Sequence, residues 1–264
     1  MANPFGDDFM AAGYAASRPA VHPRVIDQLR VWMDGAVVHR AADIGCGAGL
    51  STRPLASLAR MSVGFDPAES MVRAAARVVP GALFVTAGGE AMPFDDHSID
   101  LLTAAGSLNY ARDLDATFAE AVRVLAPGGL LAVYDFSPGR SFVDSDRLDA
   151  WFEAFIARYP FPASQARPLS PSLLEAAASD LVLVRGETFE IPLALEPAFH
   201  VDYMLTETCV QDAVRRGTPL ESIRSWVTET LAPVFDGRPH DVLFRGYLAT
   251  LTGTQERRNT GLRD

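Results

Sequence analysis

A glycine-rich run and an acidic residue downstream of it carry the clearest chemistry in this sequence. Asp43 to Gly49 reads Asp-Ile-Gly-Cys-Gly-Ala-Gly and lies between an apolar run typical of a strand and a segment with helical spacing. A glycine turn in this place lets the backbone approach a nucleotide closely. Asp66 follows Gly45 by 21 residues and ends the next apolar run, where a carboxylate is in register to bind a ribose diol.

The spacing of the glycines separates two kinds of nucleotide site. The dinucleotide fingerprint places its third glycine five positions after the first, whereas Gly49 lies four positions after Gly45. Asp43, two residues before the first glycine, fits poorly beside a pyrophosphate but suits the ammonium group of an amino acid. Since both kinds of site use an acid such as Asp66, that residue does not discriminate between them.

The elements that must position these residues alternate between short apolar runs and alanine-rich helical segments, which favours a parallel sheet with crossover helices. The predicted strands of the first half cover 41–44, 61–65, 83–86, 99–104 and 130–135. The predicted helices cover 25–32, 51–60, 68–79 and 114–125. A turn at 127–129, Pro-Gly-Gly, is expected before the fifth strand.

The pattern changes after Asp135. Helices are expected over 144–158, 172–178, 199–216 and 223–231, a strand pair or one long strand over 181–193, and a last strand over 242–252. The predicted fold class is α/β, a doubly wound Rossmann-like seven-stranded sheet with five parallel core strands, an added edge pair and helical lid insertions. We expect an N-terminal helical segment over 1–35 that covers a cofactor, a cofactor-binding core over 36–140, and lid insertions with the last two strands over 141–264.

Composition excludes several function classes. All 23 basic residues are arginine, so a Schiff-base lysine and a phosphate-loop lysine are both excluded. The formal net charge of −10 argues against nucleic acid as a partner. Two distant cysteines, Cys46 and Cys209, exclude a disulfide framework. With no apolar stretch long enough to span a bilayer and no basic leader, we expect a cytoplasmic protein without a membrane partner.

Four ordered segments of the chain resemble the class I S-adenosylmethionine-dependent methyltransferases. Asp43 to Gly49 is similar to their first motif, and Asp66 to their ribose-binding acid. The stretch 90–100 is similar to their adenine-side segment, and 118–129 to the helix and turn before their fifth strand. Tyr14 to Pro19, with a following His-Pro pair, resembles the start of the methyltransferase type 11 and trans-aconitate methyltransferase-like subgroup.

The resemblance implies S-adenosyl-L-methionine as cofactor and a set of residues around it. Tyr14 and Arg18 would lie near its methionine end, and Arg18 could bind its carboxylate in a bidentate manner. The full cofactor-binding set that the resemblance implies is Tyr14, Arg18, Asp43, Gly45, Cys46, Gly47, Asp66, Pro67, Met71, Gly89, Glu90, Ala91, Ala105 and Tyr110.

Two positions depart from the family pattern. Gly88 stands where an aspartate usually reaches the adenine amine, so either Glu90 substitutes for it or backbone groups hold the adenine. Asn109 and Tyr110 replace a His-Trp pair close to the transferred methyl, so the acceptor of a family member does not carry over.

The acceptor side of the site is less defined. His200, Tyr203, Met204 and Glu207 share one face of the predicted 199–216 helix. The candidate catalytic residues are His200 as a base, Tyr110 and Glu207, although a histidine near a helix start is also typical of a surface or capping residue. Asp135, at the end of strand five, suits either substrate contact or a structural role.

Other residues with reactive side chains have plain structural interpretations. Cys46 suits a small filler between glycines, because no base partner for its thiol is evident. Asp95, Asp96 and His97 favour a solvated turn, because adjacent residues rarely converge on one ion. We therefore expect no metal site.

The sequence thus predicts S-adenosylmethionine-dependent methyl transfer to a small-molecule acceptor by in-line displacement, catalysed mainly by proximity and desolvation. The alternatives are an NAD(P)-dependent oxidoreductase on a Rossmann sheet and a non-catalytic binding protein that keeps the cofactor fold. The acceptor, the methylated atom and the oligomeric state do not follow from the sequence.

Overall fold

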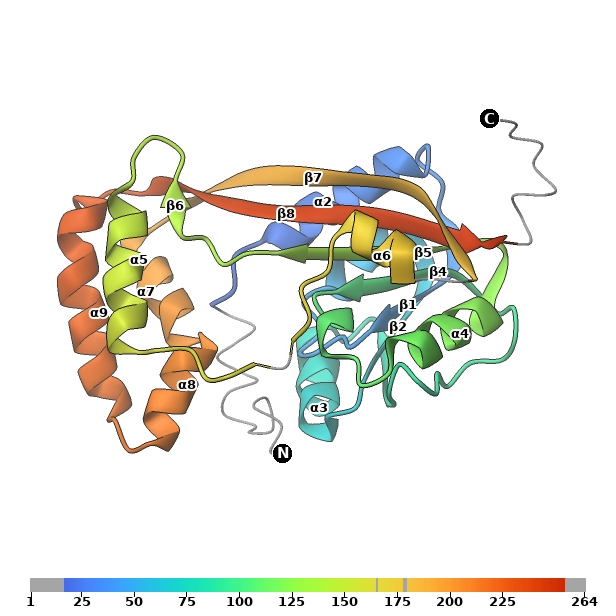
Figure 1. The fold of residues 1–264 in the computed structure, drawn as a ribbon, viewed down its shortest axis with the longest axis horizontal. Coiled ribbons are helices and arrows are strands. Elements are labelled where there is room, and N and C mark those ends of the chain that lie inside the picture. Colours follow the sequence, from blue (N-terminus) through green and yellow to red (C-terminus); the bar gives the residue numbers. More distant parts are fainter. Residues whose placement is uncertain (1–16, 165, 178–179, 255–264) are drawn as a thin grey trace. The chain divides into compact units, whose positions relative to one another are not determined.

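The computed structural model describes residues 17–164, 166–177 and 180–254, and its chain divides into two compact units (Figure 1). We call the first the helical unit; it holds the described residues of Met1–Val21, Ser137–Gln165 and Glu190–Arg245. We call the second the sheet unit; it holds the described residues of His22–Phe136, Ala166–Phe189 and Gly246–Asp264.

Five parallel strands form the core of the sheet unit, as the sequence predicts. They are β1 (Val38–Ile44), β2 (Ala59–Asp66), β3 (Leu83–Thr86), β4 (Ile99–Ala105) and β5 (Leu125–Phe136). The described strands form an eight-stranded sheet in the order β3-β2-β1-β4-β5-β8-β6, with β7 paired to β8. Since the order reverses between β1 and β4, this is a doubly wound sheet, a fold in which ligands generally bind at the carboxyl ends of the strands.

Helices α2 (Val21–Trp32), α3 (Glu69–Val78) and α4 (Leu114–Val124) agree with the predicted helices to within a few residues. The Asp113 side chain caps α4 by accepting a hydrogen bond from the Ala116 N–H at 3.0 Å. The α4 face towards the core buries Leu114, Thr117, Phe118, Ala121 and Val124.

The helix predicted over 51–60 is wrong. The structure has only a short 3-10 helix, η1 (Arg53–Ser57), and β2 already begins at Ala59. Two local features account for this. Ser51 and Thr52 point their hydroxyls back at Asp43, and Pro54 at the first turn can donate no backbone hydrogen bond.

The turn predicted at 127–129 lies inside β5. Ile99 pairs with Leu125 and Leu101 pairs with Leu130, so the ladder between β4 and β5 shifts register across these residues. Gly128 has φ +79°. The Pro-Gly-Gly run therefore forms an irregularity in one long strand rather than a connection before it.

Strands β7 (Leu181–Leu195) and β8 (His240–Gly253) form the edge pair that the sequence predicts, and β7 is one long strand. Residues 131–136 of β5 pair antiparallel with residues 246–251 of β8. The two-residue β6 (Ser141–Phe142) pairs with the start of β8 and is too short to leave a sequence pattern. Helix α6 (Pro171–Ala177) places Leu174 in the sheet-unit core.

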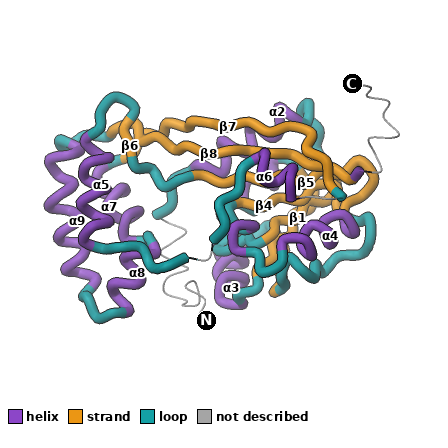
Figure 2. The backbone as a smooth tube through the Cα atoms, viewed as in Figure 1, coloured by secondary structure: helices purple, strands orange, loops and turns teal. Residues whose placement is uncertain are grey.

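Figure 2 shows the helices of the helical unit as one group: α5 (Arg147–Arg158), α7 (Pro197–Leu205), α8 (Thr208–Arg215) and α9 (Leu220–Phe235). The single helix predicted over 199–216 is wrong, because α7 ends at Leu205 and α8 begins at Thr208. At the break, Thr206 donates its hydroxyl to the Tyr203 carbonyl at 2.7 Å and Glu207 takes an extended conformation. Glu207 is therefore the residue before α8 and does not share a helix with His200.

Candidate active site

Asp43 anchors the start of the glycine loop from inside the sheet unit. Its side chain is fully buried. One carboxylate oxygen accepts the Ser51 and Thr52 hydroxyls, each at 2.6 Å, and the other accepts the Thr103 hydroxyl at 2.8 Å. Burial raises the pKa of Asp43, and these three hydroxyl groups oppose the rise. Contact of Asp43 with a ligand ammonium group stays a prediction; in this structure its two carboxylate oxygens accept hydrogen bonds from these three hydroxyls.

The glycine loop has a backbone that side chains would obstruct. Gly45 and Gly47 have φ of +64° and +52°. A Cβ atom on Gly45 would meet the Ser107 Cβ atom at 2.5 Å, whereas no atom of the described residues lies within 4 Å of a Cβ atom built on Gly47. Ser107 donates its hydroxyl to the Ile44 carbonyl and so ties the segment after β4 to the loop. Gly45 is therefore required for packing, and Gly47 leaves an open side on the loop.

Asp66 connects the end of β2 to the same loop. One carboxylate oxygen accepts the Gly47 N–H at 3.1 Å, and the other accepts the Ala68 N–H at 2.8 Å. Burial raises the pKa of Asp66, and the two N–H groups oppose the rise. Each carboxylate oxygen can accept a further hydrogen bond. The carboxylate is thus fixed in place with capacity left for a ligand diol.

The remaining loop residue with a reactive group is Cys46. Its side chain is buried, and its thiol contacts the Gly47 carbonyl at 3.6 Å. Burial raises the pKa of the thiol, with smaller contributions from the charges of Asp43 and Asp66. A thiol held protonated in this way is a poor nucleophile, in agreement with the filler role.

The Glu90 side chain contacts the backbone just before the first residue of α4. Its Oε1 atom accepts the N–H groups of Arg112 and Asp113, at 3.1 and 3.4 Å. A Cβ atom on neighbouring Gly89 would meet the Thr117 side chain at 3.1 Å. Glu90 therefore helps to fix the segment after β3 against α4, and its side chain is already engaged with protein N–H groups.

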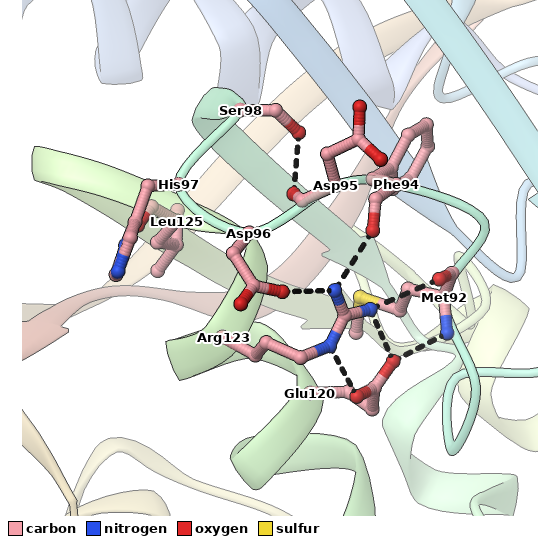
Figure 3. Close-up of polar contacts among 9 residues, drawn as sticks. All are labelled: Met92, Phe94, Asp95, Asp96, His97, Ser98, Glu120, Arg123 and Leu125. Atoms are coloured by element: carbon pink, nitrogen blue, oxygen red, sulfur yellow. Dashed lines mark hydrogen bonds and ion pairs between the residues drawn. The ribbon is translucent and has the colours of Figure 1, made fainter.

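Arg123 makes a network of hydrogen bonds that holds residues 92–96, which follow Glu90 in the chain (Figure 3). Arg123 donates to both carboxylate oxygens of Glu120, each at 2.7 Å, and to Asp96 at 2.8 Å. It also donates to the backbone carbonyls of Phe94 and Met92, at 2.8 and 3.1 Å. The hydrogen bonds from Arg123 lower the pKa of Glu120, and Glu120 also accepts the Met92 N–H. The fork of one guanidinium thus ties α4 to the loop that leads into β4.

Two of the three residues before β4 that could suggest a metal have side-chain partners, and the third, Asp95, accepts a hydrogen bond through its backbone. Asp96 pairs with Arg123, His97 contacts the Leu125 carbonyl through Nδ1 at 3.0 Å, and Ser98 donates to the Asp95 carbonyl at 2.7 Å. Across residues 17–164, 166–177 and 180–254, no group of three acidic, histidine or cysteine side chains is arranged to hold a metal ion.

The ends of β4 and β5 carry a second polar group. Asn109 donates its side-chain amide to the Asp135 carboxylate at 2.8 Å, and Phe136 donates its backbone N–H to the other carboxylate oxygen at 2.8 Å. Tyr110, a predicted catalytic and cofactor residue, is 60% exposed. It lies in a short 3-10 turn, η2 (Leu108–Tyr110), directly after the Ser107 that contacts the glycine loop.

The other two predicted catalytic residues lie in the helical unit. His200 is fully buried among aromatic rings of Trp151, Tyr203 and Phe235. Neither ring nitrogen hydrogen-bonds to any described residue, and burial lowers the pKa of His200 to about 3. The surface or capping position that the sequence also suggested does not fit this placement.

Glu207 pairs with Arg18 inside the same unit. The Arg18 guanidinium lies 3.4 Å from the Glu207 carboxylate, and it also donates to the Thr206 carbonyl at 3.4 Å. It stacks over the Tyr203 ring at 5.2 Å from the ring centre. Burial raises the pKa of Glu207, and Arg18 and Arg140 oppose the rise. Tyr14, which the sequence groups with Arg18, lies outside the described residues.

The sheet unit therefore brings most of the predicted cofactor residues to one edge, where the parallel strands end. These are Asp43, Gly45, Cys46, Gly47, Asp66, Pro67, Met71, Gly89, Glu90, Ala91, Ala105 and Tyr110. Arg18, His200 and Glu207 belong to the helical unit. The hydroxyl partners of Asp43 were not predicted from the sequence. The signal was present, because Thr103 is a polar residue within an otherwise apolar strand and a Ser-Thr pair follows the glycines.

The glycine loop fits S-adenosylmethionine on structural grounds. Gly47 leaves open space where a side chain would project, and the fixed Asp66 carboxylate lies beside it. Residues 42–133, which contain both, match the family model described as a methyltransferase domain. Within the described residues, no helix is long and apolar enough to cross a membrane.

Curated proteins similar to this chain are also named as methyltransferases. Methyltransferase GfsG from Streptomyces halstedii is 32% identical over an alignment of 196 residues that covers 67% of this chain and 67% of the relative. A methyltransferase of Mycobacterium bovis is 30% identical over 120 residues, covering 46% of this chain and 47% of the relative. The match thus spans about half the length of that relative. Demethylmenaquinone methyltransferase from Renibacterium salmoninarum is 33% identical over 98 residues, 37% of this chain and 41% of the relative.

Solved structures share the fold. A proposed type II methyltransferase from Anaeromyxobacter dehalogenans superposes with a TM-score of 0.67 at 22% identity, covering 84% of this chain and 94% of that one. The [4+2]-cyclase SpnF gives a TM-score of 0.53 at 18% identity, covering 88% of this chain and 81% of that one. From the motif match, the curated relative matched over two thirds of its length and the doubly wound sheet, the chain belongs to the class I S-adenosylmethionine-dependent methyltransferases.

Proposed function

We propose that this protein methylates a small-molecule acceptor by in-line displacement, with the chain contributing alignment and exclusion of water rather than a charged catalytic group. When bound, S-adenosylmethionine supplies a methyl group on a sulfonium. The observation that carries the proposal is the Asp66 carboxylate, fixed by the Gly47 and Ala68 N–H groups next to the open side of the glycine loop.

In this proposal Asp66 binds the ribose diol, and the Gly45–Gly47 backbone approaches the methionine portion of the cofactor. Pro67, Met71, Gly89 and Ala91 line the adenine side, and Ala105 and Tyr110 lie beside the reacting end. Glu90 uses its Oε1 atom to hold this segment against α4, so either its other carboxylate oxygen or backbone groups of the segment hold the adenine. Tyr14 and Arg18 remain predictions for the methionine end.

Asp43 has a positioning role in this proposal. Its buried carboxylate holds Ser51 and Thr52 on one side and Thr103 of β4 on the other. It thereby fixes the loop relative to two strands of the sheet. Any effect of Asp43 on the cofactor would therefore be transmitted through the loop.

A small acceptor is supported by the relatives. The Renibacterium relative is named for demethylmenaquinone, which is a small molecule. Neither His200 nor Glu207 is placed as an obvious base, since His200 is enclosed by aromatic rings and Glu207 is paired with Arg18. This supports catalysis by proximity and desolvation.

Titration calorimetry with S-adenosylhomocysteine tests the cofactor assignment. We expect the full chain to bind it, and Asp66→Asn to weaken binding about tenfold or more, the size expected when a hydrogen bond to a charged group is lost. Asp115→Asn, an exposed aspartate on α4, is the matched control and should bind like the wild type. Tighter binding of NAD than of S-adenosylhomocysteine, or unchanged affinity in Asp66→Asn, would contradict the assignment.

A further inference from the structure

A polar cluster of the sheet unit lies where β4, β5 and β8 come together. Asp135 and Tyr247 are directly opposite each other in the antiparallel ladder between β5 and β8. Side chains of such a pair project from the same face of the sheet. Asn109, from the turn after β4, donates to the Asp135 carboxylate at 2.8 Å. A carboxyl, an amide and a phenol therefore gather at the ligand edge of the sheet.

This cluster adjoins the cofactor loop through the segment after β4. A Cβ atom built on Gly106 would lie 2.9 Å from the Asp135 carboxylate, and the next residue, Ser107, packs against Gly45. Gly106 has φ +63°, a conformation that glycine adopts without strain. Gly106 and Ser107 therefore connect Asp135 to the loop that we assign to the methionine portion of the cofactor.

The Asp135 carboxylate has binding capacity left. It is partly exposed, and its hydrogen bonds from the Asn109 amide and from the Phe136 N–H occupy one position on each oxygen. An ionised carboxylate offers about four such positions. Both bonds come from neutral donors, and within the part of the chain that the structure describes no arginine forms an ion pair with this carboxylate. Burial raises its pKa, and the two donors oppose the rise.

The surroundings of the cluster are apolar. Tyr247 packs in the core with Leu108, Leu174 and Leu181, and its hydroxyl is buried without a hydrogen-bond partner in the described part of the chain. Arg167 lies beside Asn109, but its guanidinium donates to the Ala111 carbonyl at 2.7 Å. A ligand group at Asp135 would therefore meet one carboxylate in apolar surroundings.

We propose that Asp135 recognises the acceptor, and that the acceptor is an uncharged, largely apolar compound whose hydroxyl group donates a hydrogen bond to the Asp135 carboxylate. This rests on the proposed function, and it selects against carboxylate acceptors. A carboxylate has no proton to donate and would be repelled by Asp135 at short range. Asn109 is a positioning residue that holds the Asp135 side chain towards the acceptor.

The test uses two probes with the same apolar body, 2-naphthol and 2-naphthoate. Both are titrated by calorimetry into the full chain saturated with S-adenosylhomocysteine, at pH 7.5. We expect 2-naphthol to bind at least tenfold more tightly than 2-naphthoate. In Asp135→Asn the preference should shrink about tenfold, because the charge that repels naphthoate and strengthens the bond to naphthol is gone. Asp135→Ala should lose the preference as well.

Two controls separate this inference from the cofactor assignment. Asp115→Asn removes an exposed negative charge from the same unit and should keep the wild-type preference. S-adenosylhomocysteine affinity is measured first in every variant and should stay unchanged in both Asp135 variants, which shows that the site is folded. If S-adenosylhomocysteine fails to bind the wild type, the proposed function is wrong and this inference with it. If it binds but naphthol binding is absent, equal to that of naphthoate, or unaffected by both substitutions, the acceptor assignment alone is overturned.

Discussion

Arg18 and Glu207 form an ion pair inside the helical unit, although they are 189 residues apart in sequence. Their side chains are 19% and 6% exposed, and the Arg18 Nη1 and Glu207 Oε1 atoms are 3.4 Å apart. Arg18 also donates to the Thr206 carbonyl, so it joins the segment before α2 to the break between α7 and α8. A carboxylate this deeply buried depends on its cation, because desolvation otherwise disfavours its charged form.

Glu207→Gln should destabilise the protein by about 1 to 3 kcal/mol, because it leaves the Arg18 charge without its carboxylate in a mostly buried position. The partial exposure of Arg18 keeps the expected loss below that of a fully buried pair. The free energy of unfolding is measured with urea. Glu229→Gln, an exposed residue on α9, is the control and should change stability by less than about 0.5 kcal/mol. Equal stability of the two variants would show that the ion pair is not stabilising.

His200→Leu should remove a pH dependence of stability. The folded-state pKa of about 3 lies below the unfolded value near 6.5. The unfolded chain therefore binds more protons as the pH falls below about 6.5, and His200 costs the wild type about 1.4 kcal/mol of stability per pH unit down to the folded pKa. Above pH 6.5 the variant should match or exceed the wild type, because two unpaired ring nitrogens are lost.

The measurement is urea unfolding of both proteins between pH 7.5 and 5.0, where carboxyl groups common to both contribute equally. The stability difference in favour of His200→Leu should widen as the pH falls. Gln28→Leu replaces an exposed residue that does not titrate and should show no such trend. A constant difference across this range would mean that the His200 ring takes up a proton in the folded state.

The sequence correctly predicts the location of residues that lie at the end of a strand or in the turn after it. Asp66 is the last residue of β2 and Gly45 directly follows β1, so a correct strand prediction places both at the same edge of the sheet. The helical unit could not be read in this way. The predicted sharing of a helix face by His200 and Glu207 assumed an unbroken helix, and the break depends on the Thr206 hydroxyl and on Arg18, which is remote in sequence.

Other features of the structure depend on which hydrogen-bond partners the side chains have. The helix predicted after the glycine loop is absent because Ser51 and Thr52 bond to Asp43, and helical periodicity carries no information about such a contact. The contact of Glu90 with the α4 N–H groups was likewise not predicted, because it depends on how that helix packs. Tertiary contacts thus determine the local structure at positions where the sequence pattern alone allows more than one conformation.

Asp43→Ala should destabilise the protein by about 2 to 4 kcal/mol, because it leaves three buried hydroxyls without their acceptor at about 1 kcal/mol each. Asp43→Asn keeps one acceptor oxygen and should cost about half as much. Both changes should weaken S-adenosylhomocysteine binding in the same order, since they loosen the glycine loop. Urea unfolding and calorimetry measure the two effects. Full stability with lost binding would instead indicate direct contact of Asp43 with the cofactor.

Arg123→Lys should loosen the loop before β4. A lysine ammonium cannot reproduce the fork that reaches Glu120, Asp96 and two backbone carbonyls together. We expect a loss of about 1 to 2 kcal/mol in stability and faster amide hydrogen exchange over residues 92–96. Arg112→Lys, at an exposed position before α4, should leave the exchange of these residues unchanged. Unchanged exchange in Arg123→Lys would show that the loop is held by other contacts.

Asn109→Ala should raise the pKa of Asp135. In the folded protein burial raises this pKa and the Asn109 amide is one of two donors that oppose the rise, so its removal leaves the ionised carboxylate less stabilised. Carbon NMR of aspartate-labelled protein follows the titration, and the signal missing from Asp135→Asn identifies the residue. Gln28→Ala, which removes an exposed amide from α2, should leave the titration in place. A pKa that falls or stays constant in Asn109→Ala would show that the amide does not hold the ionised form, and Asn109 would lose its positioning role at the acceptor.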